Sequence, residues 1–196
     1  RHFGDLPAAP DVAVESAPRV IPHVLIRTKE LEQSHVCLGT DGLPQAHADR
    51  YASYVLNTVL GGSMSSRLFQ NVREKRGLAY SVFSGLNAYR DTGCFTVYAG
   101  CANEAVAELV DVVVGEIRRV KHEPPSEAEL RRAKDHLKGS LMLNLESTSS
   151  RMSNLAREEI YFKHFVTLDE TIEGVEKVTR DDMDRVAQVQ IGRAHV

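Results

Sequence analysis

Histidine is the first residue type to test for chemistry, because a helix that binds zinc presents two imidazoles four residues apart. No two histidines have that spacing, so neither HExxH nor its inverse HxxEH occurs in the chain. The sequence therefore predicts no helix-borne metal site, and only a site assembled from distant segments stays open. The eight histidines are His2, His23, His35, His47, His122, His136, His164 and His195.

Serine is the next candidate, as a nucleophile. No GxSxG elbow occurs in the chain. Ser63, Ser65 and Ser66 follow Gly61-Gly62, where loop formation and helix capping account for them. A serine triad assembled in space stays open, and it would make the chain an unrelated α+β enzyme.

A basic segment offers a third kind of chemistry. Val72-Arg73-Glu74-Lys75-Arg76-Gly77 leads into Leu78-Ala79-Tyr80. This pattern places Arg73 near the end of a short helix and Tyr80 at the start of a strand, with a glycine turn between them. Both side chains can face one cleft and donate hydrogen bonds. A solvated helix end beside a packing tyrosine is the alternative interpretation.

The periodicity of apolar residues predicts the elements that position this segment. Alternation favours strands over Val20–Lys29 and Ser34–Leu38, and a hairpin of Tyr80–Tyr89 with Cys94–Ala99. Helical spacing favours a helix from Ala46 that stops at Gly61-Gly62, and a second from about 65 to 76. Five more helices are predicted. One is capped by Asn103, one begins with the capping box of Ser126 and Glu129, one covers Ser149–Lys163, and two short ones follow Leu168 and Thr179.

This order of strands and helices predicts the α+β class, with an antiparallel sheet covered by helices. The net charge of −3 argues against nucleic acid or an anionic membrane surface as the main partner, and no apolar run is long enough to span a membrane. Three cysteines without CxxC spacing (Cys37, Cys94 and Cys101) favour reduced thiols. The chain begins without methionine or a secretion signal, so we expect a fragment of a longer, cytoplasmic protein.

The segment from Leu60 to Val82 resembles the C-terminal half of the pitrilysin/insulinase-type zinc peptidases, which include the mitochondrial processing peptidases and their bacterial relatives. The shared features are a Gly-Gly-Ser loop, Ser-Arg-Leu-Phe, and Arg-Glu-Lys-Arg-Gly-Leu-Ala-Tyr. The resemblance covers nearly the whole chain. It implies a linker with the end of the preceding half at 1–19, the inactive half at 20–190, and a tail at 191–196.

The resemblance also implies a function. Members of that family pair two homologous halves around a chamber, and the N-terminal half binds zinc through HxxEH and a distal Glu. The C-terminal half is usually inactive and contributes an Arg and a Tyr seven residues apart, which correspond to Arg73 and Tyr80 here. The expected partners are the catalytic half and a peptide substrate, whose developing oxyanion such donors stabilise. Gly61 and Gly62 are further candidates for lining the chamber.

Two further expectations follow from the resemblance. The family half closes with an apolar strand after its last helix, but residues 190–196 do not read as that strand. An open sheet edge would then favour a homodimer. The alternative function is a structural subunit of the same family whose partner half has also lost its zinc motif.

Overall fold

The computed structural model describes residues 16–18 and 21–191 of the chain. The expected linker at 1–19 and tail at 191–196 therefore lie almost entirely outside the described residues, and so does the place of a closing strand.

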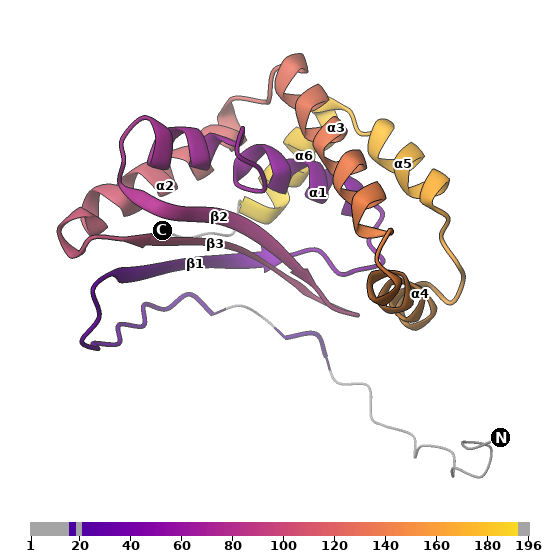
Figure 1. Ribbon diagram of the computed structural model, residues 1–196, viewed down its shortest axis with the longest axis horizontal. Helices are drawn as coiled ribbons and strands as arrows, with labels where there is room; N and C mark the ends of the chain where they lie inside the picture. Colours follow the sequence, from indigo (N-terminus) through magenta and orange to yellow (C-terminus); the bar gives the residue numbers. More distant parts are fainter. Residues whose placement is uncertain (1–15, 19–20, 192–196) are drawn as a thin grey trace, which may run out of the picture.

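A three-stranded antiparallel sheet forms one layer of the described part (Figure 1). Its strands are β1 (Ser34–Gly42), β2 (Ala79–Ala88) and β3 (Gly93–Cys101), in the spatial order β1-β3-β2. The predicted hairpin is β2–β3, which the Arg90–Gly93 turn connects, and β1 pairs along the other edge of β3. Strand β3 thus lies at the centre of the sheet, between β1 and β2.

All the described helices lie on one face of this sheet (Figure 1). They are α1 (Arg50–Leu60), α2 (Val106–His122), α3 (Glu127–Asn144), α4 (Thr148–Phe162), α5 (Leu168–Glu176) and α6 (Arg180–Ile191), with a short 3-10 turn, η2 (Asn103–Ala105), before α2. The predicted α+β class with an antiparallel sheet covered by helices is confirmed. Among the described residues, no helix combines the length and the apolar character needed to cross a membrane.

The core lies between the sheet and the helices. Helix α1 is at its centre, because Val55, Leu56 and Leu60 are almost completely buried. They pack in one cluster with Val97 of β3 and Met183 of α6. Each such side chain stabilises the fold by about 1.5–3 kcal/mol relative to an exposed one. The apolar side of α1 therefore faces the core.

The helix starts were predicted with mixed success. Ser126 and Glu129 form the predicted capping box at the start of α3. Asn103 does not cap α2, because its side chain accepts a hydrogen bond from Ser34 Oγ at 2.6 Å and the 3-10 turn intervenes before Val106. A long-range contact to β1 has therefore replaced the local cap.

The strand predicted over Val20–Lys29 is not present in its described part. Residues 21–29 lie in no helix or strand, and Ile21, Val24 and Ile26 are exposed. The alternating pattern favours an extended backbone, but a strand also needs a neighbour for its N–H and C=O groups. No described segment supplies that neighbour.

Candidate functional site

Arg73 lies on a single turn of π-helix, η1 (Phe69–Glu74), which follows the Gly-Gly-Ser loop. The Lys75 N–H donates to the Gln70 carbonyl at 3.0 Å, which is the five-residue spacing of a π-turn. Val72 anchors the turn because it is completely buried in the core. Gly77 then reverses the chain with a φ of 62°, a value that favours glycine, and leads it into β2.

Tyr80 owes its orientation to an irregularity at the start of β2. Ala79 pairs with Cys101 and Ser81 pairs with Gly100, so Tyr80 is an extra residue without a partner on β3. Such a bulge interrupts the alternation of a strand and redirects a side chain. Tyr80 and Ser81 are accordingly both exposed, between the buried Ala79 and Val82.

The two predicted residues contact each other directly. The Arg73 guanidinium carbon lies 4.7 Å from the centre of the Tyr80 ring and 4.8 Å from the centre of the Phe69 ring. The guanidinium therefore stacks on two aromatic rings. The electron-rich faces of the rings attract the positive charge of Arg73 and restrict the motion of its flexible side chain. Arg73 keeps 36% of its side chain exposed and Tyr80 is 78% exposed, so both groups remain accessible.

Sequence reasoning missed Phe69 as a member of this cluster. The signal was available, because side chains four residues apart meet on one side of a helical turn and Phe69 precedes Arg73 by four. Stacking uses the face of the guanidinium and leaves its N–H edge free for acceptors. Among the described residues, Arg73 forms one loose ion pair, in which its Nε lies 3.7 Å from Glu74 Oε1.

A buried acid on α2 braces the π-turn. Glu116 Oε1 accepts hydrogen bonds from Asn71 Nδ2 at 2.8 Å and from Arg119 Nη1 at 3.0 Å. Its second oxygen, Oε2, is buried and has no hydrogen-bond partner within the described part of the chain. Because Asn71 lies two residues before Arg73, this link joins the turn to a helix that packs on the sheet.

A second brace holds the preceding loop. The Arg67 guanidinium donates to both oxygens of Glu129, at 3.0 and 3.4 Å, and to the Glu123 carbonyl at 3.2 Å. Burial opposes the charge on Glu129, but hydrogen bonds from Arg67 and Ser126 outweigh it and lower the pKa of that carboxyl to about 2. The loop is therefore fixed to the start of α3 by an ion pair that persists at neutral pH.

The two glycines of the loop have different surroundings. Gly61 is buried beside β2, and its carbonyl accepts a hydrogen bond from the Ser84 N–H at 3.2 Å. A Cβ at Gly61 would lie 2.5 Å from that nitrogen, so packing alone requires glycine there. Gly62 is exposed, and its contribution to substrate binding stays a prediction.

The cluster of Phe69, Arg73 and Tyr80 offers N–H and O–H donors on an exposed aromatic surface. It contains no group that could bind a metal, and no set of three histidine, cysteine or acidic side chains in the described ranges could hold one. The geometry thus suits recognition of an acceptor, such as a peptide carbonyl or an oxyanion, and it supplies no base or nucleophile.

Comparison with known proteins concerns the whole chain and not only the site. The family described as the peptidase M16 inactive domain matches residues 1–137. A Bacillus subtilis protein named zinc protease YmxG is 40% identical over 188 residues, which cover 96% of this chain and 46% of that protein. A zinc protease of Streptomyces coelicolor is 39% identical over 190 residues, covering 95% and 41%. The chain thus spans less than half the length of these relatives.

Solved structures share the fold. A conserved protein from Enterococcus faecalis has a TM-score of 0.74 at 26% identity, covering 82% of this chain and 37% of that one. A structure described as the peptidase M16 inactive domain from Pseudomonas fluorescens has a TM-score of 0.73 at 24% identity, covering 81% and 38%. A chain of Complex III2 from Candida albicans reaches 0.75 at 21% identity, covering 83% and 41%. The last two are similar in fold alone.

Proposed function

This chain belongs to the peptidase M16 inactive-domain family, and from that premise we propose that it is the substrate-binding half of a two-half zinc endopeptidase. Arg73 and Tyr80 bind the peptide at the bond to be cleaved, and the partner half supplies the zinc site. The observation that carries this proposal is the stacking of Arg73 between Phe69 and Tyr80 with both donors exposed.

The physical argument concerns charge that develops during the reaction. Attack on a peptide carbonyl turns its oxygen into an oxyanion, which donors of fixed geometry stabilise more than they stabilise the ground state. The two rings hold the Arg73 fork in place, so little conformational entropy is lost when it binds. Tyr80 adds a neutral O–H donor from the bulge.

We expect the 196-residue chain by itself to cleave no peptide, because the activation of water belongs to the catalytic half. The expected partners are that half and an extended peptide. If the protein is instead a structural subunit, the sequence upstream of this chain should lack HxxEH.

The test replaces single donors in the complete two-half protein. Arg73→Lys keeps the charge and removes the planar fork, and Tyr80→Phe removes one hydroxyl. Each should lower kcat/KM for peptide cleavage by about 10²–10³, the usual loss for one oxyanion donor. Phe69→Leu removes one stacking ring and should cost a smaller factor, about 3–10.

Lys75→Ala is the matched control, because Lys75 is an exposed basic residue two positions from Arg73. Its kcat/KM should stay near that of the wild type. Wild-type turnover in both Arg73→Lys and Tyr80→Phe would refute the proposal. Thermal unfolding of each variant checks that the fold is intact.

A further inference from the structure

Helix α4 leaves three large apolar side chains exposed to solvent. Met152, Leu155 and Ile160 are 67%, 53% and 62% exposed. In the same helix the polar Glu158 is buried and Asn154 is half-buried. A helix on the surface of a domain normally buries its large apolar side chains, so this combination is unusual.

Specific contacts hold α4 in this orientation. Glu158 accepts hydrogen bonds from Asn154 Nδ2 at 2.6 Å and from the Val166 N–H at 3.2 Å. A cavity of about 420 Å³ lies between α4 and α1, lined by polar side chains such as Arg50 and by apolar ones such as Phe162. A rotation of α4 that buried its exposed apolar residues would break the two hydrogen bonds of Glu158 and expose its carboxylate.

Further exposed apolar residues flank α4 along the chain. Two end α3 just before α4 begins, and one follows α4. Single exposed apolar residues are ordinary, but a large exposed set is typical of an interaction surface. We call this set the α4 patch: Met142, Leu143, Met152, Leu155, Ile160 and Phe165, each at least half exposed.

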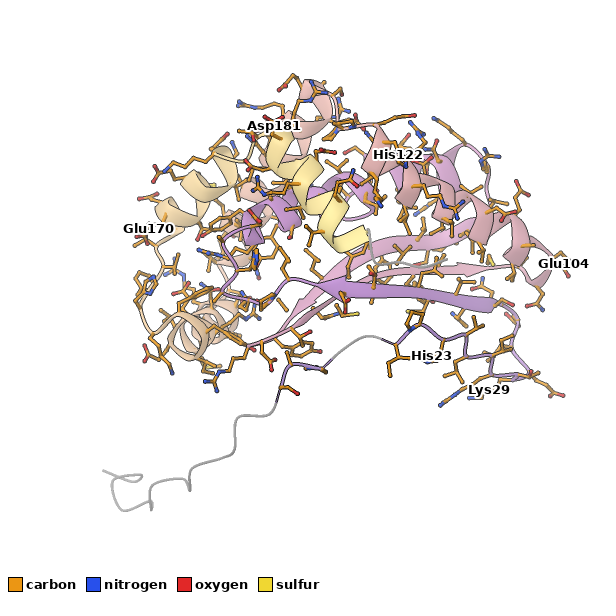
Figure 2. All side chains as sticks on the ribbon, turned by 180° about the vertical axis from the view of Figure 1, so that it is seen from behind. His23, Lys29, Glu104, His122, Glu170 and Asp181 are labelled. Carbon is orange, nitrogen blue, oxygen red and sulfur yellow. The ribbon has the colours of Figure 1, made fainter. Side chains whose placement is uncertain are left out.

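We propose that the α4 patch is the surface on which this half docks against the rest of its own protein, the catalytic half. This inference rests on the proposed function for the identity of the partner. The relatives have more than half of their length outside the matched region, enough for a second half. The described residues 16–18 also run back toward the end of the sheet where α4 lies (Figures 1 and 2).

The chemistry of the patch specifies its counterpart. Methionine and leucine side chains on a helix about 22 Å long favour an apolar, adaptable surface over a charged one. Burying such side chains supplies the main stabilisation of an interface, because the hydrophobic effect scales with the apolar area removed from water. The catalytic half should therefore present an apolar face to α4.

The experiment measures thiol accessibility in the complete protein. Leu155→Cys places a thiol in the α4 patch, in a background where Cys37 and Cys94 are serine. Glu104→Cys is the matched control, because Glu104 is exposed at the opposite end of the molecule (Figure 2). The Leu155→Cys thiol should react with a maleimide at least 10-fold more slowly than the control, and the two rates should converge in urea.

Equal reaction rates in the folded complete protein would overturn the inference. Slow labelling that depends on protein concentration and accompanies a dimeric mass would also overturn it, because a second copy would then cover the patch. Adding Arg73→Lys separates this inference from the proposed function. That change should lower turnover and leave the labelling rate unchanged, so either idea can fail without the other.

Discussion

Arg73 and Tyr80 lie close together because of two local departures from regular structure. A π-turn carries the arginine, and a bulge redirects the tyrosine toward it. Such irregularities are retained where they orient a functional side chain. The hydrogen bond between Asn71 and Glu116 supports the same π-turn. The position of the Arg73 guanidinium therefore depends on Glu116, which is 43 positions away (116 − 73).

The ion pair of Arg67 with Glu129 leads to a prediction about pH. The folded-state pKa of Glu129 is about 2 and its ordinary value is 4.5, so ionised Glu129 stabilises the fold above pH 4.5. That stabilisation is lost as pH falls from 4.5 toward 2. Urea unfolding should therefore show Glu129→Gln less stable than the wild type at pH 7, with the difference shrinking below pH 4.5.

Glu146→Gln provides the control for this series, because Glu146 is exposed and forms no ion pair within the described part of the chain. Its free energy of unfolding should follow that of the wild type at every pH. A constant difference between Glu129→Gln and wild type from pH 7 to pH 3 would contradict the assigned pKa.

At the scale of elements, the end of α1 is pressed against β2. Gly61 has no space for a side chain, since a Cβ would lie 2.5 Å from Ser84 N and 2.6 Å from Ser84 Oγ. Gly61→Ala should destabilise the fold by about 2–3 kcal/mol, because either α1 or the strand must shift. Urea unfolding at pH 7 measures this change.

Gly139→Ala is the matched comparison for Gly61→Ala. Gly139 lies within α3, and nothing lies within 4 Å of a Cβ built there. Alanine has the higher helix propensity, so this substitution should stabilise the fold by about 0.5–1 kcal/mol. Similar effects of the two substitutions would show that the close contact with Ser84 does not limit the fold.

At the scale of the whole molecule, all the described helices lie on one face of the sheet (Figure 1), and the residues of the α4 patch are exposed. The open sheet edges leave the predicted homodimer as a second way to bury surface, and it stays a prediction.

Removal of metal tests whether the zinc site belongs to the partner half and not to this chain. A chelator should leave the thermal unfolding midpoint of the 196-residue chain unchanged, because no cluster of three histidine, cysteine or acidic side chains in its described residues could hold a metal. The same treatment should abolish cleavage by the complete protein. Chelator saturated with calcium is the control, and a fall in the midpoint with free chelator alone would contradict the assignment of the metal to the partner half.

Local sequence patterns were enough to predict much of the structure of this protein. The α+β class, the β2–β3 hairpin, the Ser126–Glu129 capping box and the stop of α1 at Gly61 all follow from periodicity and turn chemistry. The segment with Arg73 and Tyr80 could also be singled out from the sequence, because its residue types, spacing and resemblance to a known family agree.

Tertiary structure alone decided the rest. The extra residue at Tyr80 arises from the pairing of β2 with β3, and the hydrogen bond that supports the π-turn joins Asn71 to Glu116, 45 positions away; no local pattern contains such contacts. For the same reason the strand predicted from Val20 failed, since alternation makes a backbone extended but only a neighbouring strand can bond it. Sequence thus determines what each segment favours, and packing determines which of those preferences are satisfied.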